Sequence, residues 1–170
     1  MHDIFYFTDI HGNYPLFKYI MKWCNEQDPE ATIIFGGDAC DRDIHGYKIM
    51  KELLDNPKVL YLAGNHEVMF VHAARYLHDH YTGEMDRTKI IDFLASCNDS
   101  AVFVSTANGG VPTLVDWMLD GMPMQFVDEI NALPRTYSFG NVDFCHAGGD
   151  YPTFCKVEEG NYNTSDESMV

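Results

Sequence analysis

The chain has 170 residues, of which 46% are hydrophobic, and it carries a formal net charge of −15 at pH 7. This length predicts one domain with a substantial core. The acidic charge argues against nucleic acid or an anionic membrane as the main partner, but it is compatible with bound cations. No apolar run is long enough to span a membrane, the N-terminus does not resemble a signal peptide, and five cysteines without a Cys-x-x-Cys pair indicate reduced thiols in a cytoplasmic protein.

Three short apolar segments alternate with helical patterns in the first part of the chain. Strands are predicted over residues 3–8, 31–35 and 59–63. Between them, Asn13 is a candidate helix cap, and apolar residues recur at helical spacing from Leu16 to Cys24 and again from Ile49 to Leu54. Strands joined by crossover helices form parallel sheets with right-handed connections. The sequence therefore predicts an α/β fold with a largely parallel central sheet and covering helices.

The remainder is predicted to be mainly helical and to finish with a β-hairpin. Helices are expected over residues 67–97, interrupted near Thr82-Gly83, and over 113–119 and 124–132, with a turn at Asn108-Gly-Gly110. The segments 136–139 and 142–145 flank Gly140-Asn141, which favours a hairpin. We expect one domain over residues 1–158 and a polar tail over 159–170.

Polar side chains lie just after four of the predicted strands. They are Asp9 and His11, Asp38 and Asp41, Asn65 and His66, and His146. Open α/β sheets bind their ligands at the carboxyl ends of strands, so we expect these side chains to lie close together.

Their chemistry indicates a metal site. Carboxylate, imidazole and amide oxygen together suit a divalent ion such as Mn, Fe or Zn. The side chains of Asp9 and His11 share a face of an extended segment, and Asp38 could bridge two ions. Two ions about 3.5–4 Å apart are a common device for in-line attack on phosphorus.

These residues carry a resemblance to a known family. The segments are Asp9-Ile-His11, Gly37-Asp-Ala-Cys-Asp-Arg42, Gly64-Asn-His-Glu67 and His146-Ala-Gly148. They resemble the calcineurin-like metallophosphoesterases, and most closely the phosphoprotein phosphatase branch with its small bacteriophage lambda-type serine/threonine phosphatases. The resemblance covers residues 2 to 150 and implies a layered metallophosphoesterase fold with metal ligands at the carboxyl ends of strands.

The resemblance implies two divalent ions, with Mn the expected metal and Fe, Zn or Mg the alternatives. The first ion would be held by Asp9, His11 and Asp38, and the second by Asp38, Asn65 and His146. His66 would be the general acid, oriented by Asp41, and Arg42 would bind the phosphoryl oxygens. The chemistry of these groups agrees with the roles of His66 and Arg42, because an imidazole paired with a carboxylate is kept protonated and a planar guanidinium suits phosphate.

The chain also departs from the family pattern. The family usually has glycine at the position of Asp43. It also supplies a further metal-binding histidine and a second phosphate-binding arginine downstream, whereas no histidine follows His146 and no arginine follows Arg135. The resemblance therefore predicts a second metal site that is weak, or one completed in another way.

Three functions are compatible with these observations. The first is a metal-dependent phosphatase for phosphate monoesters, acting on a phosphorylated protein or a small phosphate ester, with phosphoserine and phosphothreonine as the expected groups. The second is a dinucleoside-polyphosphate hydrolase, a group with similar motifs. The third is a non-catalytic member of the fold that binds metal, phosphate or a protein.

Overall fold

The computed structural model describes residues 2–147. Its elements follow one another in this order: β1 (Ile4–Phe7), α1 (Tyr14–Gln27), β2 (Thr32–Phe35), α2 (Gly46–Leu54), β3 (Val59–Tyr61), α3 (Asn65–His80), α4 (Arg87–Ser96), α5 (Ser100–Ala107), α6 (Val111–Leu119), α7 (Met124–Asn131), β4 (Thr136–Phe139) and β5 (Val142–Cys145). The predicted polar tail, residues 159–170, and the predicted end of the domain lie outside the described residues. In the described part, no helix combines the length and apolar character needed to cross a membrane.

The first three strands form the expected parallel sheet, in the order β1-β2-β3. The central strand is the most buried, and its residues Ile33, Ile34 and Phe35 are at most 5% exposed. Such continuous burial is typical of a strand covered on both faces. The prediction of an α/β fold with a parallel sheet is confirmed.

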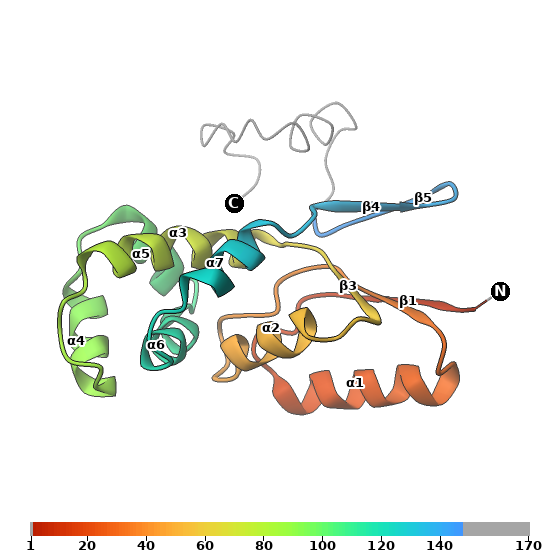
Figure 1. Cartoon of the computed structure of the whole chain (residues 1–170), viewed down its shortest axis with the longest axis horizontal. Coiled ribbons are helices and arrows are strands. Elements are labelled where there is room, and N and C mark those ends of the chain that lie inside the picture. Colours follow the sequence, from red (N-terminus) through yellow and green to blue (C-terminus); the bar gives the residue numbers. More distant parts are fainter. Residues whose placement is uncertain (1, 148–170) are drawn as a thin grey trace.

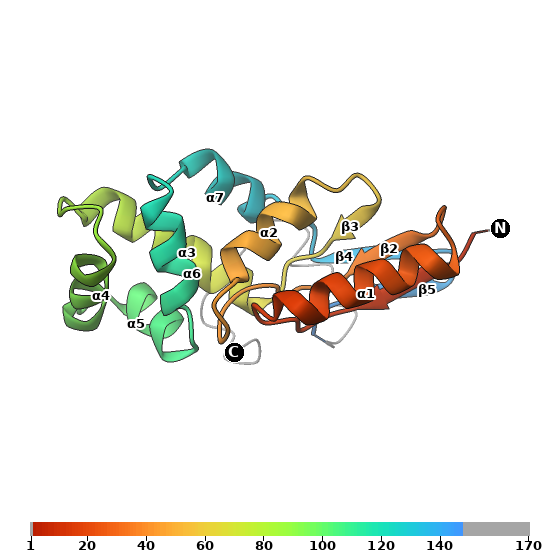
Figure 2. The same cartoon turned by 90° about the horizontal axis from the view of Figure 1, so that it is seen from below.

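Two layers enclose this sheet. Helix α1 runs along one face, and the antiparallel β4-β5 hairpin lies on the other (Figures 1 and 2). On the hairpin side, the Tyr6 hydroxyl donates to the carbonyl of Cys145 at 2.8 Å, and the Tyr6 ring packs against Phe144. This contact attaches the hairpin to β1 and brings the end of β5 toward the carboxyl ends of the parallel strands.

Helices α3 to α7 form the other end of the molecule (Figure 1). Their shared core contains large side chains that are fully buried, including Phe70, Leu77, Trp117 and Met118. Helix α3 starts at the end of β3 and packs against both α5 and α7. The helical end is therefore joined to the sheet directly at the carboxyl edge of β3.

Helix α5 was not among the predicted elements. Its sequence is rich in β-branched residues, which favour strands. Its apolar residues also show little of the spacing that marks one face of a helix. A local signal was present, because the Asp99 carboxylate accepts from the amides of Ala101 and Val102 as a helix cap. The other predicted helices and both hairpin strands are present, with shifts of a few residues at their ends.

Candidate metal centre

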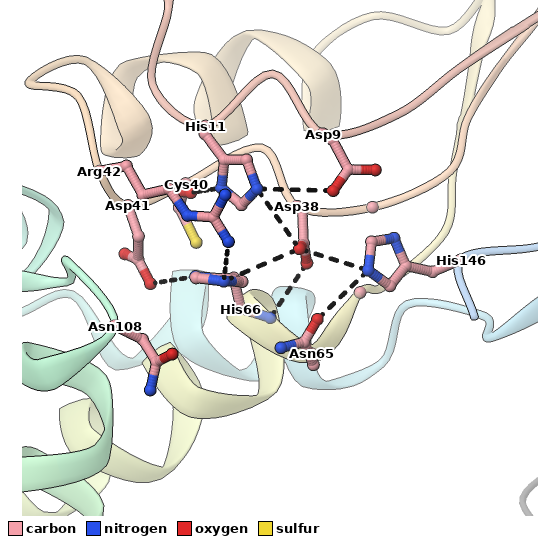
Figure 3. A network of polar contacts seen from close by, with 12 residues as sticks. Asp9, His11, Asp38, Cys40, Asp41, Arg42, Asn65, His66, Asn108 and His146 are labelled. Atoms are coloured by element: carbon pink, nitrogen blue, oxygen red, sulfur yellow. Dashed lines mark hydrogen bonds and ion pairs between the residues drawn. The ribbon is translucent and has the colours of Figure 1, made fainter. Parts of the chain in front are cut away.

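Three imidazoles converge on the carboxylate of Asp38 (Figure 3). The distances from Asp38 Oδ2 are 3.3 Å to His146 Nε2, 3.7 Å to His11 Nε2 and 3.8 Å to His66 Nε2. Asp38 is only 3% exposed, and the three histidines come from segments far apart in the sequence. The fold thus assembles the cluster at the carboxyl ends of the strands, as expected.

The other two predicted metal ligands lie at the edges of this cluster. Asp9 Oδ1 is 3.5 Å from His11 Nε2, and Asn65 Oδ1 is 3.2 Å from His146 Nε2. Two sets of three groups have possible ligand atoms within 4.8 Å of one another: His11, Asp38 and His66, and Asp9, Asp38 and His146. Asp38 belongs to both sets, which agrees with a bridging position between two ions. The assignment of each remaining side chain to one ion stays a prediction.

The ring nitrogens of two histidines show that the cluster suits cations. Nδ1 of His11 lies 3.1 Å from the carbonyl of Cys40, and Nδ1 of His146 lies 2.9 Å from the carbonyl of Gly36. Each Nδ1 can donate to its carbonyl, which leaves the Nε2 lone pair facing the carboxylates. Among residues 2–147, the buried His11 Nε2 has no hydrogen-bond partner. A divalent ion would satisfy it.

The backbone of the site is held in an uncommon conformation. Among the described residues, six non-glycine residues have positive φ, and five of them belong to the site: Asp9, His11, Asp38, Asp41 and Arg42. Each such residue costs on the order of 1–3 kcal/mol and persists only when its surroundings enforce it. Part of that enforcement is a ladder between the two loops, in which the amides of Asp9 and His11 donate to the carbonyls of Gly37 and Asp38, each at 3.0 Å.

His66 has a carboxylate on one side and a guanidinium on the other. Its Nδ1 is 2.8 Å from Asp41 Oδ2, and its Nε2 is 3.4 Å from Nη2 of Arg42. His66 and Asp41 are buried, whereas Arg42 is exposed. The three predicted catalytic residues are therefore adjacent, with a fixed pair inside and a guanidinium at the surface.

The charges of the site shift its pKa values. Burial alone would lower the pKa of His66, but the Asp41 hydrogen bond and the charge of Asp38 outweigh burial and raise it above its ordinary value. The interaction with Asp38 raises the pKa of His146 to about 8. Burial acts to raise the pKa of Asp38, but His146 and His66 outweigh it and lower that pKa. The metal-free centre therefore favours imidazolium beside carboxylate, and a metal ion bound by His146 must displace the proton of that ring.

Comparison with known proteins identifies the arrangement. The family model for calcineurin-like phosphoesterases matches residues 2–159. The chain belongs to the calcineurin-like phosphoesterase family. No curated protein gives a significant match.

Solved structures with the same fold belong to longer proteins. One is described as a "putative diadenosine tetraphosphatase"; it aligns with a TM-score of 0.51 at 14% identity and covers 87% of this chain and 55% of its own. A metallophosphoesterase from Sphaerobacter thermophilus aligns with a TM-score of 0.51 at 13% identity, over 84% of this chain and 45% of its own. The chain spans about half the length of these phosphoesterases, and at this identity the likeness shows a common fold.

The structure also reveals a residue to which the sequence pattern assigned no role. Glu67 is fully buried, and its carboxylate accepts four hydrogen bonds of 2.7–2.8 Å. The donors are the amides of Asp38, Ala39 and Gly64 and the hydroxyl of Tyr61. Glu67 therefore ties the loop after β2 to the start of α3. Its place directly after His66 in the family motif was the available signal.

The chain departs from the family pattern at Asp43 and downstream of His146, and only the first of these positions lies in the described part of the chain. Asp43 lies at the surface, where its carboxylate accepts from the amide of Ile44 and its own amide donates to the carbonyl of His11. The loop thus closes without glycine. Any replacement for the missing histidine and arginine in residues 148–170 lies outside the described part of the chain.

Proposed function

We propose that this chain is a metal-dependent phosphatase that hydrolyses phosphate monoesters, with phosphoserine and phosphothreonine in proteins as its substrate class. The observation that carries the proposal is the convergence of three imidazoles and the Asp9 carboxylate around Asp38, beside the His66–Asp41 pair. A network of ion pairs that only supports the fold does not need an imidazole nitrogen that, like His11 Nε2, faces its centre without a hydrogen bond. A phosphoesterase site that holds two cations does.

The ligands proposed for the ions are Asp9, His11 and Asp38 for one and Asp38, Asn65 and His146 for the other. When bound, two divalent ions would supply Lewis acidity for the phosphoryl oxygens and would activate a water molecule as the nucleophile. Mn²⁺ suits this mixed oxygen and nitrogen donor set, and Fe, Zn or Mg are the alternatives.

The protein's own groups would act on the other side of the phosphorus. His66 would donate a proton from Nε2 to the leaving oxygen, since Asp41 holds Nδ1 and favours the protonated ring. Arg42 would bind the phosphoryl oxygens, because its guanidinium is exposed next to His66 Nε2. The exposed position of Arg42, together with the 52% exposure of the Asp9 side chain, would let a phosphate on a polypeptide reach the centre.

A second candidate is hydrolysis of a dinucleoside polyphosphate. It is favoured by the structural neighbour described as a "putative diadenosine tetraphosphatase", although that likeness rests on the fold. A third candidate is a binding protein without catalysis, which would fit a site that the 170 residues alone leave without the family's last histidine and second arginine. These functions differ in a direct assay, because only the first two hydrolyse a substrate: the first cleaves a phosphate ester and the second a phosphoanhydride bond.

The test uses the purified 170-residue chain with added Mn²⁺ and three substrates: a phosphoserine peptide, p-nitrophenyl phosphate and diadenosine tetraphosphate. We expect phosphate release from the first two. The Asp38→Asn variant should remain folded but lose activity, whereas Asp79→Asn, the same change at an exposed position, should retain it. Retention of more than about a tenth of the rate by Asp38→Asn, a loss of only ~1.4 kcal/mol, would contradict the bridging role.

Cleavage of diadenosine tetraphosphate alone would favour the second candidate. Absence of turnover on all three substrates, with metal bound, would favour the third.

A further inference from the structure

The loop that carries the proposed general-acid pair is held from outside by the helical end of the molecule. The backbone amide of Asp41 donates to the side-chain hydroxyl oxygen of Thr113 at 3.0 Å, across 72 residues of sequence. The next amide, that of Arg42, donates to the carbonyl of Gly109 at 3.0 Å. Thr113 is 1% exposed and lies near the start of α6. Two consecutive amides of the loop are therefore fixed by one short segment that is remote in sequence.

These two contacts fall where the backbone most needs support. Asp41 and Arg42 have φ values of +69° and +66°, in the left-handed region that residues other than glycine rarely adopt. A hydrogen bond to each amide restrains the peptide planes and can hold this conformation. Without the Thr113 hydroxyl, the buried amide of Asp41 would lose its acceptor, and the loop could relax only by moving Asp41.

The packing around Thr113 leaves little freedom for another arrangement. A Cβ added to Gly46 would lie 2.7 Å from the Thr113 hydroxyl oxygen and 2.9 Å from the Asp41 amide nitrogen. A Cβ added to Gly109 would lie 2.9 Å from the Arg42 amide nitrogen. Such distances are shorter than real side-chain contacts, so both glycines permit the close approach of helix and loop.

We propose that Thr113 is a positioning residue, which acts through the backbone of Asp41 to aim the His66 imidazole. The chain of contacts is short: Thr113 fixes the Asp41 amide, and the Asp41 carboxylate holds His66 Nδ1 at 2.8 Å. The kinetic part of this inference rests on the proposed phosphatase function. The structural part does not, because the contacts exist in the metal-free protein.

The test compares Thr113→Val, which keeps the shape but removes the hydroxyl, with Thr113→Ser, which keeps the hydroxyl. In the metal-free chain, NMR should show slow hydrogen exchange of the Asp41 amide in the wild type and in Thr113→Ser. Exchange should be roughly tenfold or more faster in Thr113→Val. The amide of Ala39, which donates to Glu67 instead, is the internal control and should not change.

Two further readouts separate positioning from simple support of the fold. The proton between His66 Nδ1 and Asp41 should give a downfield resonance that broadens or shifts in Thr113→Val and recovers in Thr113→Ser. With Mn²⁺, Thr113→Val should lower kcat about tenfold on an alkyl phosphate and much less on p-nitrophenyl phosphate, since a misaimed acid matters most for a poor leaving group. KM should stay nearly unchanged.

Several results would overturn the inference. They are rapid exchange of the wild-type Asp41 amide, unchanged exchange in Thr113→Val, or equal kinetic losses on the two esters. Exchange of the Asp41 amide in the wild type needs no variant, so this measurement can overturn the inference even if Thr113→Val does not fold. A wild-type chain without turnover would refute the proposed function instead, while the exchange and resonance measurements would still decide the role of Thr113.

Discussion

Replacement of Glu67 by glutamine tests whether one buried carboxylate holds the loops of the candidate metal centre together. Its Oε1 accepts from the Ala39 amide and the Tyr61 hydroxyl, and its Oε2 accepts from the amides of Asp38 and Gly64. All four partners donate to the carboxylate, an arrangement that suits its ionised form. Burial and the charge of Asp38 oppose ionisation and raise the pKa of Glu67, which means that the hydrogen bonds are needed to sustain the charge.

The cost of Glu67→Gln follows from how the amide can best fit. With its oxygen toward Asp38 and Gly64, its NH2 group faces the Ala39 amide and the Tyr61 hydroxyl, and the hydroxyl can reverse and accept. The Ala39 amide and one N–H of the glutamine are then both left without an acceptor, and each such buried group costs about 1–3 kcal/mol. Two other hydrogen bonds weaken by about 1 kcal/mol each on losing a charged acceptor, and the cheaper burial of a neutral group offsets part of this.

We therefore expect Glu67→Gln to lower the free energy of unfolding by about 3–6 kcal/mol, and the Tm by roughly 6–24 °C for a chain of this size. Urea and thermal unfolding of the metal-free chain measure the change. Tyr61→Phe is the matched control, because it removes one of the four donors and should cost about 1 kcal/mol. A Glu67→Gln variant within about 0.5 kcal/mol of the wild type would refute this reasoning.

Three further predictions concern catalysis and metal binding. His66→Asn should lower the rate on alkyl phosphates about 10²–10⁴-fold and on aryl phosphates far less, and equal losses in a steady-state assay would remove His66 from the role of general acid. Because the pKa of His146 is raised to about 8 in the metal-free chain, the protonated ring stabilises the fold at low pH and competes with metal there. Mn²⁺ affinity measured by calorimetry should accordingly fall about tenfold per pH unit below pH 8, and equal affinities at pH 6 and 8 would contradict this. No histidine follows His146, so the same titration should resolve one tight site and one that is at least tenfold weaker. Activity should then rise as Mn²⁺ is added in excess. Two equally tight sites would mean that another ligand exists.

The sequence was sufficient for the order of the elements other than α5, and for choosing candidate ligands that the fold brings together. Short apolar runs, the Asn13 cap and the Gly140-Asn141 turn each act locally, so they could be interpreted without the fold. The candidate ligands could be selected because parallel strands place their carboxyl ends at one edge, which turns a position in sequence into a position in space. Asp9, Asp38 and His146 meet in the structure for this reason.

Contacts between distant segments required the tertiary structure. Nothing in the sequence near Thr113 or Gly109 points to the loop of Asp41 and Arg42, since a hydrogen bond across 72 residues has no periodic signal. Helix α5 was missed because its β-branched residues oppose the helical state and tertiary packing against α3 overrides that preference. Local chemistry thus determined which side chains could bind metal, and long-range packing determined how rigidly the chain presents them.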